Sequence, residues 1–111
     1  MSDKKQSYAA RAHWVKKWNE NPSLGKYRGN VHRDAAQLRP IIDDIGYDEV
    51  KRLIDFYFKI NVKPDLMWFL YNYDRLLNEL ERIEEDRRHR EQLREATRRR
   101  MEELQLGQNP S

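Results

Sequence analysis

The sequence contains no cysteine, which excludes a disulfide framework and thiolate chemistry and suits a cytosolic protein. It also has no apolar run close to the ~20 residues that a helix needs to span a bilayer. Residues 1–6 are polar and hold no apolar core of a signal peptide. We therefore expect a soluble cytoplasmic protein that does not associate with membranes.

Apolar residues are scarce as well. Only 38% of the 111 residues are hydrophobic and 37% are charged, which leaves room for one small domain with a thin core. The net charge of +3 is unevenly spread, because residues 1–33 carry eight Lys or Arg against two acids. Residues 34–80 are acidic and residues 81–111 are balanced. The basic excess is thus confined to the first 33 residues.

The motifs of common catalytic sites are missing too. The chain has no GxSxG, no P-loop and no dinucleotide fingerprint. The histidines share no metal-ligand spacing and are interpreted as surface residues: His13, His32 and His89. Three acids flank a helix end and a helix start, where capping explains them better than a divalent cation does: Asp43, Asp44 and Asp48. We expect no enzyme activity, no catalytic residue, no metal and no cofactor.

What the sequence does contain is helical periodicity between Tyr47 and Leu80. Apolar residues recur at i, i+3, i+4 and i+7 over Val50–Phe58, and the same rule holds over Leu66–Ile83. Between the two stripes, Pro64 should end one helix and Asp65 should cap the next. Two helices on so short a connection fold back on each other. We predict an all-α protein with a compact helical core built on this antiparallel pair.

Two further helices are predicted before this pair. The first covers residues 8–19, with Ser7 as its cap. A loop over residues 26–33 should lead to the second, which covers residues 35–45 and is capped by Asp34.

The second of these helices contains Pro40, which leaves two alternatives. Either the helix begins near Leu38, with the proline in its first turn, or it kinks at Pro40. Gly46 should end this helix, and Asp48 should cap the one that follows.

Beyond Ile83 the apolar stripe stops and charged pairs at i, i+4 support an exposed helix. We predict that the helix from Leu66 continues without a break to about Leu104. A thin apolar stripe on it offers a surface for self-association: Leu93, Met101 and Leu104. The predicted organisation is a basic flexible N-terminus (1–7), a helical core (8–83), a solvent-exposed charged helix (84–105) and a disordered tail (106–111).

Basic residues alternate with aromatic ones in the first 33 residues. Lys and Arg can neutralise phosphates, and exposed aromatic rings can stack on unpaired bases. The candidate nucleic-acid-binding residues are Arg11, Trp14, Lys16, Lys17, Lys26, Arg28 and Arg33. The alternative for Trp14 and Trp18, spaced i, i+4, is the core face of a packed helix. The arginine-rich stretch near Arg98 has equal numbers of acids nearby, so we interpret it as a solvated, salt-bridged helix.

Aromatic residues outside the main stripes form the second candidate surface. Phe56, Trp68 and Tyr71 either pack under the N-terminal helix or stay exposed for a partner. We expect Trp68 to pack and leave Phe56 and Tyr71 as the partner-binding candidates.

The order of these features resembles a small helical module of phage and plasmid replication-initiation proteins, of the helicase-loader or replisome-organiser type. The resemblance covers roughly two-thirds of the chain. The matching features are Trp14 and Trp18, Arg33-Asp34-Ala35-Ala36-Gln37-Leu38, Ile41-Ile42, Gly46-Tyr47-Asp48-Glu49-Val50, Leu53-Ile54-Asp55-Phe56-Tyr57-Phe58, Trp68-Phe69 and Leu76-Leu77. In that family the module usually lies C-terminal to a winged-helix DNA-binding domain. In this chain a long charged helix follows the module.

The resemblance implies a non-enzymatic accessory protein of DNA replication or another DNA transaction, in the cytoplasm of a bacterial host. Such a protein would bind a replisome protein through Phe56 and Tyr71, and nucleic acid through Trp14, Lys16, Lys17 and Arg33. The alternative is a structural or adaptor protein with no nucleic-acid role. Its long C-terminal helix would self-associate or bind a host protein.

Overall fold

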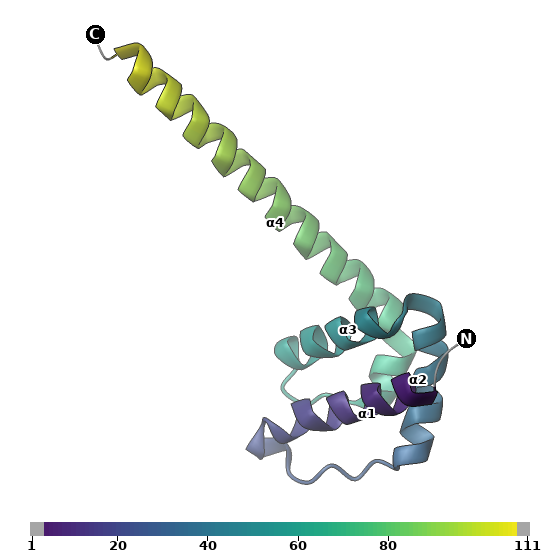
Figure 1. Ribbon diagram of the computed structural model, residues 1–111. Helices are drawn as coiled ribbons and strands as arrows, with labels where there is room; N and C mark the ends of the chain where they lie inside the picture. The colour runs from purple at the N-terminus through teal and green to yellow at the C-terminus, as the bar shows by residue number, and fades with distance from the viewer. Residues whose placement is uncertain (1–3, 109–111) are drawn as a thin grey trace. The chain divides into compact units, whose positions relative to one another are not determined.

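The computed structural model describes residues 4–108, and every regular element in that range is a helix. The elements are α1 (Lys4–Asn19), the short 3-10 helix η1 (Pro22–Leu24), α2 (Val31–Ile45), α3 (Tyr47–Ile60) and α4 (Leu66–Gln108), as Figure 1 shows. The predicted all-α class is confirmed, as are the antiparallel helix pair and the long C-terminal helix. Within residues 4–108, no helix combines the length and the apolarity that crossing a membrane requires.

The chain forms two compact units, Met1–Leu77 and Asn78–Ser111. The first contains α1, α2 and α3, which all contact one another, together with the first turns of α4. The second contains the rest of α4. The division comes earlier than the boundary expected after Ile83.

Trp14 on α1 lies at the centre of the first unit. Its side chain is 1% exposed. The indole stacks on Tyr57 with ring centroids 5.9 Å apart, and it meets the rings of Phe58 at 4.7 Å and Phe69 at 5.5 Å edge-on. Such aromatic contacts add to the area that the rings bury. The core is therefore built around α1 as well as around the α3–α4 pair.

The start of α1 differs from the prediction. The helix begins at Lys4, so Ser7 lies inside it and does not cap it. Instead, the Ser7 hydroxyl donates a 2.8 Å hydrogen bond back to the Lys4 carbonyl, a bond that serine makes within helices. The part of the predicted flexible terminus over residues 1–3 lies outside the described residues.

The start of α2 also comes earlier than predicted, because Asn30 is the cap. Its side-chain oxygen accepts a 3.0 Å hydrogen bond from the Arg33 amide, which satisfies one of the free N–H groups of the first turn. The proposed cap Asp34 is wrong, since that residue is buried within the helix. The helix does not begin near Leu38 either, and Pro40 lies in its interior on an exposed face.

Gly46 ends α2, as predicted, and it is the single residue between α2 and α3. Its φ of 91° suits glycine, and its amide donates a 2.8 Å hydrogen bond to the Ile42 carbonyl. Asp48 does not cap α3. It lies in the first turn, where a negative charge favours the positive end of the helix, and no side chain caps this end.

The Asp65 cap of α4 is confirmed, because its carboxylate accepts a 3.0 Å hydrogen bond from the Met67 amide. The helix is not unbroken, however. Asn72 has non-helical angles (φ −126°, ψ 15°), and its side chain donates a 2.8 Å hydrogen bond to the Trp68 carbonyl. A side chain that occupies a helix carbonyl in this way accompanies a kink.

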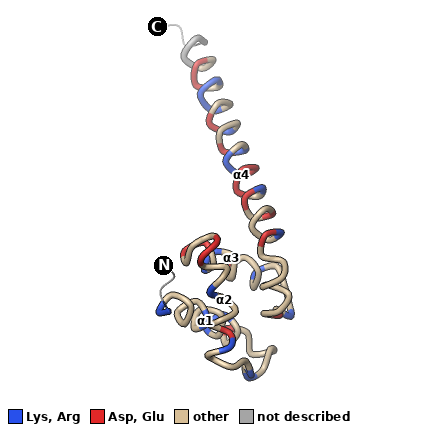
Figure 2. The backbone as a smooth tube through the Cα atoms, turned by 90° about the vertical axis from the view of Figure 1, so that its right-hand side faces the viewer, with Lys and Arg blue, Asp and Glu red and all other residues tan. Residues whose placement is uncertain are grey.

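Beyond the kink, basic and acidic residues are interspersed along α4 (Figure 2). Two of the predicted i, i+4 pairs are present, Asp86–Arg90 at 3.2 Å and Glu95–Arg99 at 3.7 Å. The helix extends to Gln108, past the predicted end near Leu104 and into the predicted tail. The last part of that tail, residues 109–111, lies outside the described residues.

Candidate nucleic-acid interface

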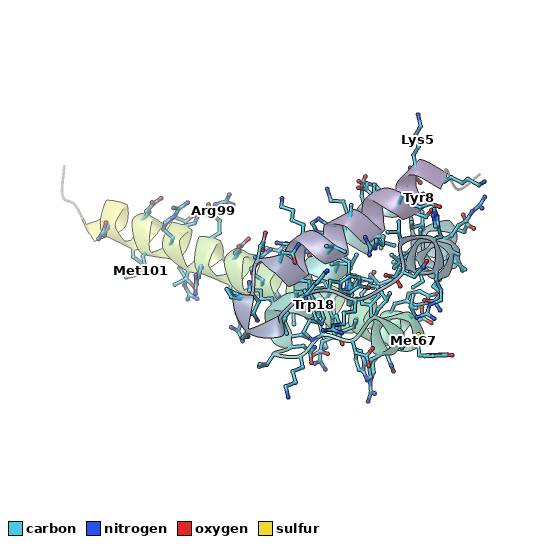
Figure 3. All side chains as sticks on the ribbon, turned by 90° about the horizontal axis from the view of Figure 1, so that it is seen from below. Lys5, Tyr8, Trp18, Met67, Arg99 and Met101 are labelled. Atoms are coloured by element: carbon cyan, nitrogen blue, oxygen red, sulfur yellow. The ribbon has the colours of Figure 1, made fainter. Side chains whose placement is uncertain are left out.

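A groove of about 660 Å³ lies in the first unit, where three segments meet. These are the loop before α2, the first turns of α2, and the connection from α3 into α4. Trp18 of α1 and Met67 of α4 also line it (Figure 3). The groove thus brings together residues that are far apart in the sequence.

Four basic side chains line this groove, and they are called the groove cations below: Lys26, Arg28, Arg33 and Lys63. All four residues are exposed. Within the described part of the chain, none of them forms an ion pair. Free cations that share a groove concentrate positive potential and attract anions.

The two acids of the groove lining do not cancel this charge. Asp65 keeps its negative charge while one of its carboxylate oxygens caps α4, and this one charge is outnumbered by the four groove cations. Asp34 is only 3% exposed and forms an ion pair with Arg11, with 3.5 Å between Nε and Oδ2. The groove therefore keeps a net positive charge.

The Asp34 carboxylate also fixes the loop that carries Lys26 and Arg28. The Tyr27 hydroxyl donates a 2.7 Å hydrogen bond to Asp34 Oδ2. Arg11 Nη2 donates a 3.0 Å hydrogen bond to the Gly29 carbonyl, and its guanidinium lies 5.2 Å from the centre of the Tyr27 ring. These contacts hold Tyr27, and with it the residues on either side, in one position.

Glycine is required at position 29, because a Cβ atom there would overlap the Asp34 carboxylate and the Tyr27 ring. The other end of the loop is held by Trp18, whose indole N–H donates a 2.9 Å hydrogen bond to the Gly25 carbonyl. The Trp18 and Tyr27 rings meet edge-on at 5.3 Å.

The surroundings of Tyr27 keep its hydroxyl group protonated, so that it can donate its hydrogen bond. Burial raises the pKa of Tyr27 well above its ordinary value, and the hydrogen bond to the Asp34 carboxylate raises it further. Arg11 and Arg33 act in the opposite direction, but with smaller effect. The phenol therefore stays protonated at neutral pH.

The structure separates the predicted nucleic-acid-binding residues into groups. Lys26, Arg28 and Arg33 are brought together in the groove. Trp14 and Arg11 are not available to a ligand, because the Trp14 ring is buried and Arg11 forms an ion pair with Asp34. A stacking role for Trp14 and a phosphate-binding role for Arg11 are therefore corrected to structural roles.

The two candidate lysines of α1, Lys16 and Lys17, lie outside the groove. Lys16 is exposed. The Lys17 ammonium lies 3.5 Å from the carboxylates of both Glu20 and Asp55. The groove instead gains Lys63, which sequence reasoning missed because it lies outside the basic first 33 residues. No local pattern marks it, and only the folding of the α3–α4 connection brings it close to Lys26.

The aromatic candidates have mixed environments. Tyr71 is 81% exposed, and Phe56 is half-buried. Trp68, which was expected to pack, does so with one face: its ring stacks on Tyr57 with 5.4 Å between centroids and an interplanar angle of 6°. The residue is still 40% exposed.

The histidines are not all free surface residues. His13 is half-buried, and its Nε2 lies 2.6 Å from Asp55 Oδ1. His32 is exposed, and its Nδ1 lies 2.7 Å from the Tyr8 hydroxyl. His89 is exposed on α4. Among residues 4–108, no three His, Cys, Asp or Glu side chains gather in a way that could hold a metal ion.

Comparison with known proteins gives no relative: no family model, curated protein or solved structure matches this chain.

Proposed function

We propose that this chain is a non-enzymatic accessory protein of phage-type DNA replication or of another DNA transaction. It binds nucleic acid through the groove and a replisome protein through a separate surface. The observation that carries the proposal is the set of four groove cations without ion-pair partners in the described chain. The resemblance of the helical module to replication-initiation proteins supports the choice of process.

The chemistry of the groove suits a phosphate backbone. Lys provides a compact charge, and Arg provides a planar fork that binds phosphate oxygens in pairs. Each neutralised phosphate releases condensed counterions, so binding weakens as salt rises. Four contacts to a duplex predict a slope of about −3.6 for the logarithm of the binding constant against the logarithm of the salt concentration.

The protein partner is assigned to aromatic side chains that are not part of the groove lining. The exposed ring of Tyr71 and the half-buried ring of Phe56 are its candidate contacts. Aromatic side chains are enriched in protein interfaces because they bury a large area with few rotatable bonds.

The test is fluorescence anisotropy with labelled single- and double-stranded DNA at low and physiological salt. The variant is the double substitution Lys26→Glu with Arg28→Glu, which reverses two charges in the groove. We expect its affinity to fall at least ten-fold at low salt. Lys16→Glu is the matched control, because Lys16 is exposed on α1 but outside the groove.

Two results would count against the proposal. If the wild-type protein bound neither DNA at low salt, the nucleic-acid function would be wrong. If Lys16→Glu weakened binding as much as the groove variant, the interface would lie on α1 and not in the groove. Circular dichroism of each variant would establish that the helices remain.

The alternative is an adaptor without a nucleic-acid role, and one observation favours it. Leu93, Met101 and Leu104 are exposed on α4. Met101 and Arg99 leave the helix on opposite sides (Figure 3), and Arg94, Arg98 and Glu102 lie beside Leu93 and Met101. Light scattering would identify a dimer that Leu93→Lys with Met101→Lys converts to a monomer. This outcome, without DNA binding, would favour the adaptor.

A further inference from the structure

We infer that the groove binds a single strand of nucleic acid whose unpaired bases stack on an aromatic shelf at the start of α4. The shelf consists of the aromatic rings of Trp68 and Tyr71 together with the side chain of Met67. This inference rests on the proposed function and specifies the ligand of the same site. It reassigns Tyr71 from the protein partner to the nucleic acid and leaves Phe56 as the candidate contact of the protein partner.

The shelf is continuous with the groove. Met67 lines the groove and is 46% exposed. Tyr71 lies four residues further along α4, so its side chain is next to Met67 on the same helix face. The kink at Asn72 comes after both residues, and the Asp65 cap fixes the turn that precedes them.

The rings of the shelf are available to a ligand. Tyr71 is 81% exposed and, in the described part of the chain, its hydroxyl and ring have no hydrogen-bond or ring partner. The Trp68 ring is held in position by its stacking on Tyr57, while the residue remains 40% exposed. An exposed ring that is already oriented loses little conformational freedom on binding.

This arrangement fits a single strand better than a duplex. A single strand presents phosphates along one edge and base faces along the other, and the groove cations and the shelf offer a partner to each. In a duplex the base faces are already stacked on their neighbours, so the shelf would gain nothing. Stacking of bases on aromatic side chains beside a basic groove is the usual mode of single-strand binding.

An acidic segment of a protein could also be attracted by the groove cations. It would pair its carboxylates with Lys26, Arg28, Arg33 or Lys63, but it offers no regular series of flat rings to the shelf. The combination of cations with adjacent exposed aromatic faces therefore favours the nucleic acid, and the acidic protein becomes an outcome of the test.

The experiment compares four labelled ligands at low salt with the full chain. They are a single-stranded oligonucleotide of about 15 nucleotides, the same sequence as a duplex, the same strand without bases, and a polyglutamate peptide. The abasic strand keeps the phosphates and removes the stacking partners. The variants are Tyr71→Ala and Tyr71→Phe. Val62→Ala is the control, since Val62 is an exposed apolar residue outside both groove and shelf.

We expect the wild-type protein to bind the single strand more tightly than the duplex and the abasic strand. Tyr71→Ala should weaken single-strand binding by roughly ten-fold, with no change for the abasic strand. Tyr71→Phe and Val62→Ala should bind as the wild type does. Because Tyr71 is so exposed, its replacement leaves the core intact, and the thermal unfolding of the variant serves to check this.

Each of the other outcomes overturns the inference in a recognisable way. Equal binding of strand and duplex, unaffected by Tyr71→Ala, would agree with the proposed function but would exclude base stacking on the shelf. An equal loss for the normal and abasic strands would mean that Tyr71 does not contact bases. Tighter binding of a polyglutamate peptide than of any oligonucleotide would assign the groove to an acidic protein. Binding to none of the ligands would reject the proposed function as well.

Discussion

At the scale of single residues, the pair of Arg11 and Asp34 explains why charged side chains near one another in sequence have different roles. The Asp34 carboxylate is buried where α1, α2 and the loop meet, and among residues 4–108 the side chains of Arg11 and Tyr27 compensate its lost hydration. A buried carboxylate needs such partners, because an isolated charge is costly in the interior. Arg11 is therefore used for structure, whereas Arg33, one residue before Asp34, is exposed and lines the groove.

Asp34→Ala should destabilise the protein by about 3 kcal/mol, because it leaves the Arg11 guanidinium without its counter-ion and Tyr27 without an acceptor. Urea unfolding followed by circular dichroism measures this. Asp43→Ala is the matched control, since Asp43 is exposed on the same helix, and surface substitutions change stability by less than about 0.5 kcal/mol. Similar losses in the two variants would contradict a structural role for the pair.

Tyr73 makes the stability of the protein sensitive to alkaline pH. Its hydroxyl donates a 2.7 Å hydrogen bond to the Asp44 carboxylate. This bond, together with partial burial and the negative charges of Asp74 and Asp44, raises the pKa of Tyr73 from 10.0 to about 12. Between these values the unfolded chain has lost the proton and the folded chain keeps it. Stability is thus fully present below pH 10 and falls as the pH rises to about 12.

Urea unfolding at a series of pH values from about 9 to about 11.5 measures this dependence. Tyr73→Phe should make the loss of stability above pH 10 shallower. The remaining slope belongs in part to Tyr27 and Tyr57, whose pKa values are raised in the same direction. A variant with the wild-type slope would mean that the Tyr73–Asp44 bond does not contribute in solution.

At the scale of elements, single residues that satisfy or interrupt the backbone bonds determine where the helices end. Asn30 and Asp65 supply side-chain oxygens at two helix starts. Gly46 lets two helices meet with one residue between them. Asn72 interrupts a helix that its apolar stripe alone would continue.

Gly46→Ala should destabilise the α2–α3 junction. The backbone angles of Gly46, φ 91° and ψ 156°, belong to a region that is nearly restricted to glycine. A Cβ there would meet nothing within 4 Å, so the cost is conformational and not a clash. We expect a loss of about 1–3 kcal/mol in urea unfolding.

Ala12→Gly, at an exposed position of α1, is the reference substitution. Replacing alanine by glycine in a helix interior lowers stability by about 1 kcal/mol. A loss below about 0.5 kcal/mol for Gly46→Ala would show that the junction can adopt other angles.

At the scale of the whole molecule, the chain divides into a unit with a core and a unit that consists of a charged helix. Nearly all buried apolar side chains lie before Leu77. The second unit is supported by ion pairs between exposed residues of α4, each worth only a few tenths of a kcal/mol. The stability of the first unit should therefore be independent of the helix end.

Removal of residues 84–111 should leave the first unit folded. The midpoint of urea unfolding, followed by the fluorescence of Trp14, Trp18 and Trp68, should stay close to that of the full chain. The helical signal should fall in proportion to the residues removed. Loss of cooperative unfolding in the shortened protein would mean that the core depends on the second unit.

The sequence by itself determined the all-α class, the approximate positions of the helices, Gly46 as a junction and Asp65 as a cap. Each of these depends on neighbours within a few residues, through the 3.6-residue period or the bonds of one helix end. The same local reasoning placed the start of α2 at Asp34 and missed the kink at Asn72. In both cases a side chain could make its hydrogen bond in more than one way.

Only the tertiary structure decided which charged and aromatic residues are available for function. Trp14 became the centre of the core because α3 and α4 bring Tyr57, Phe58 and Phe69 to it. Lys63 joined the groove because the α3–α4 connection lies beside the loop before α2. Such contacts join residues dozens of positions apart, and they follow from how helices pack and not from the period within any one of them.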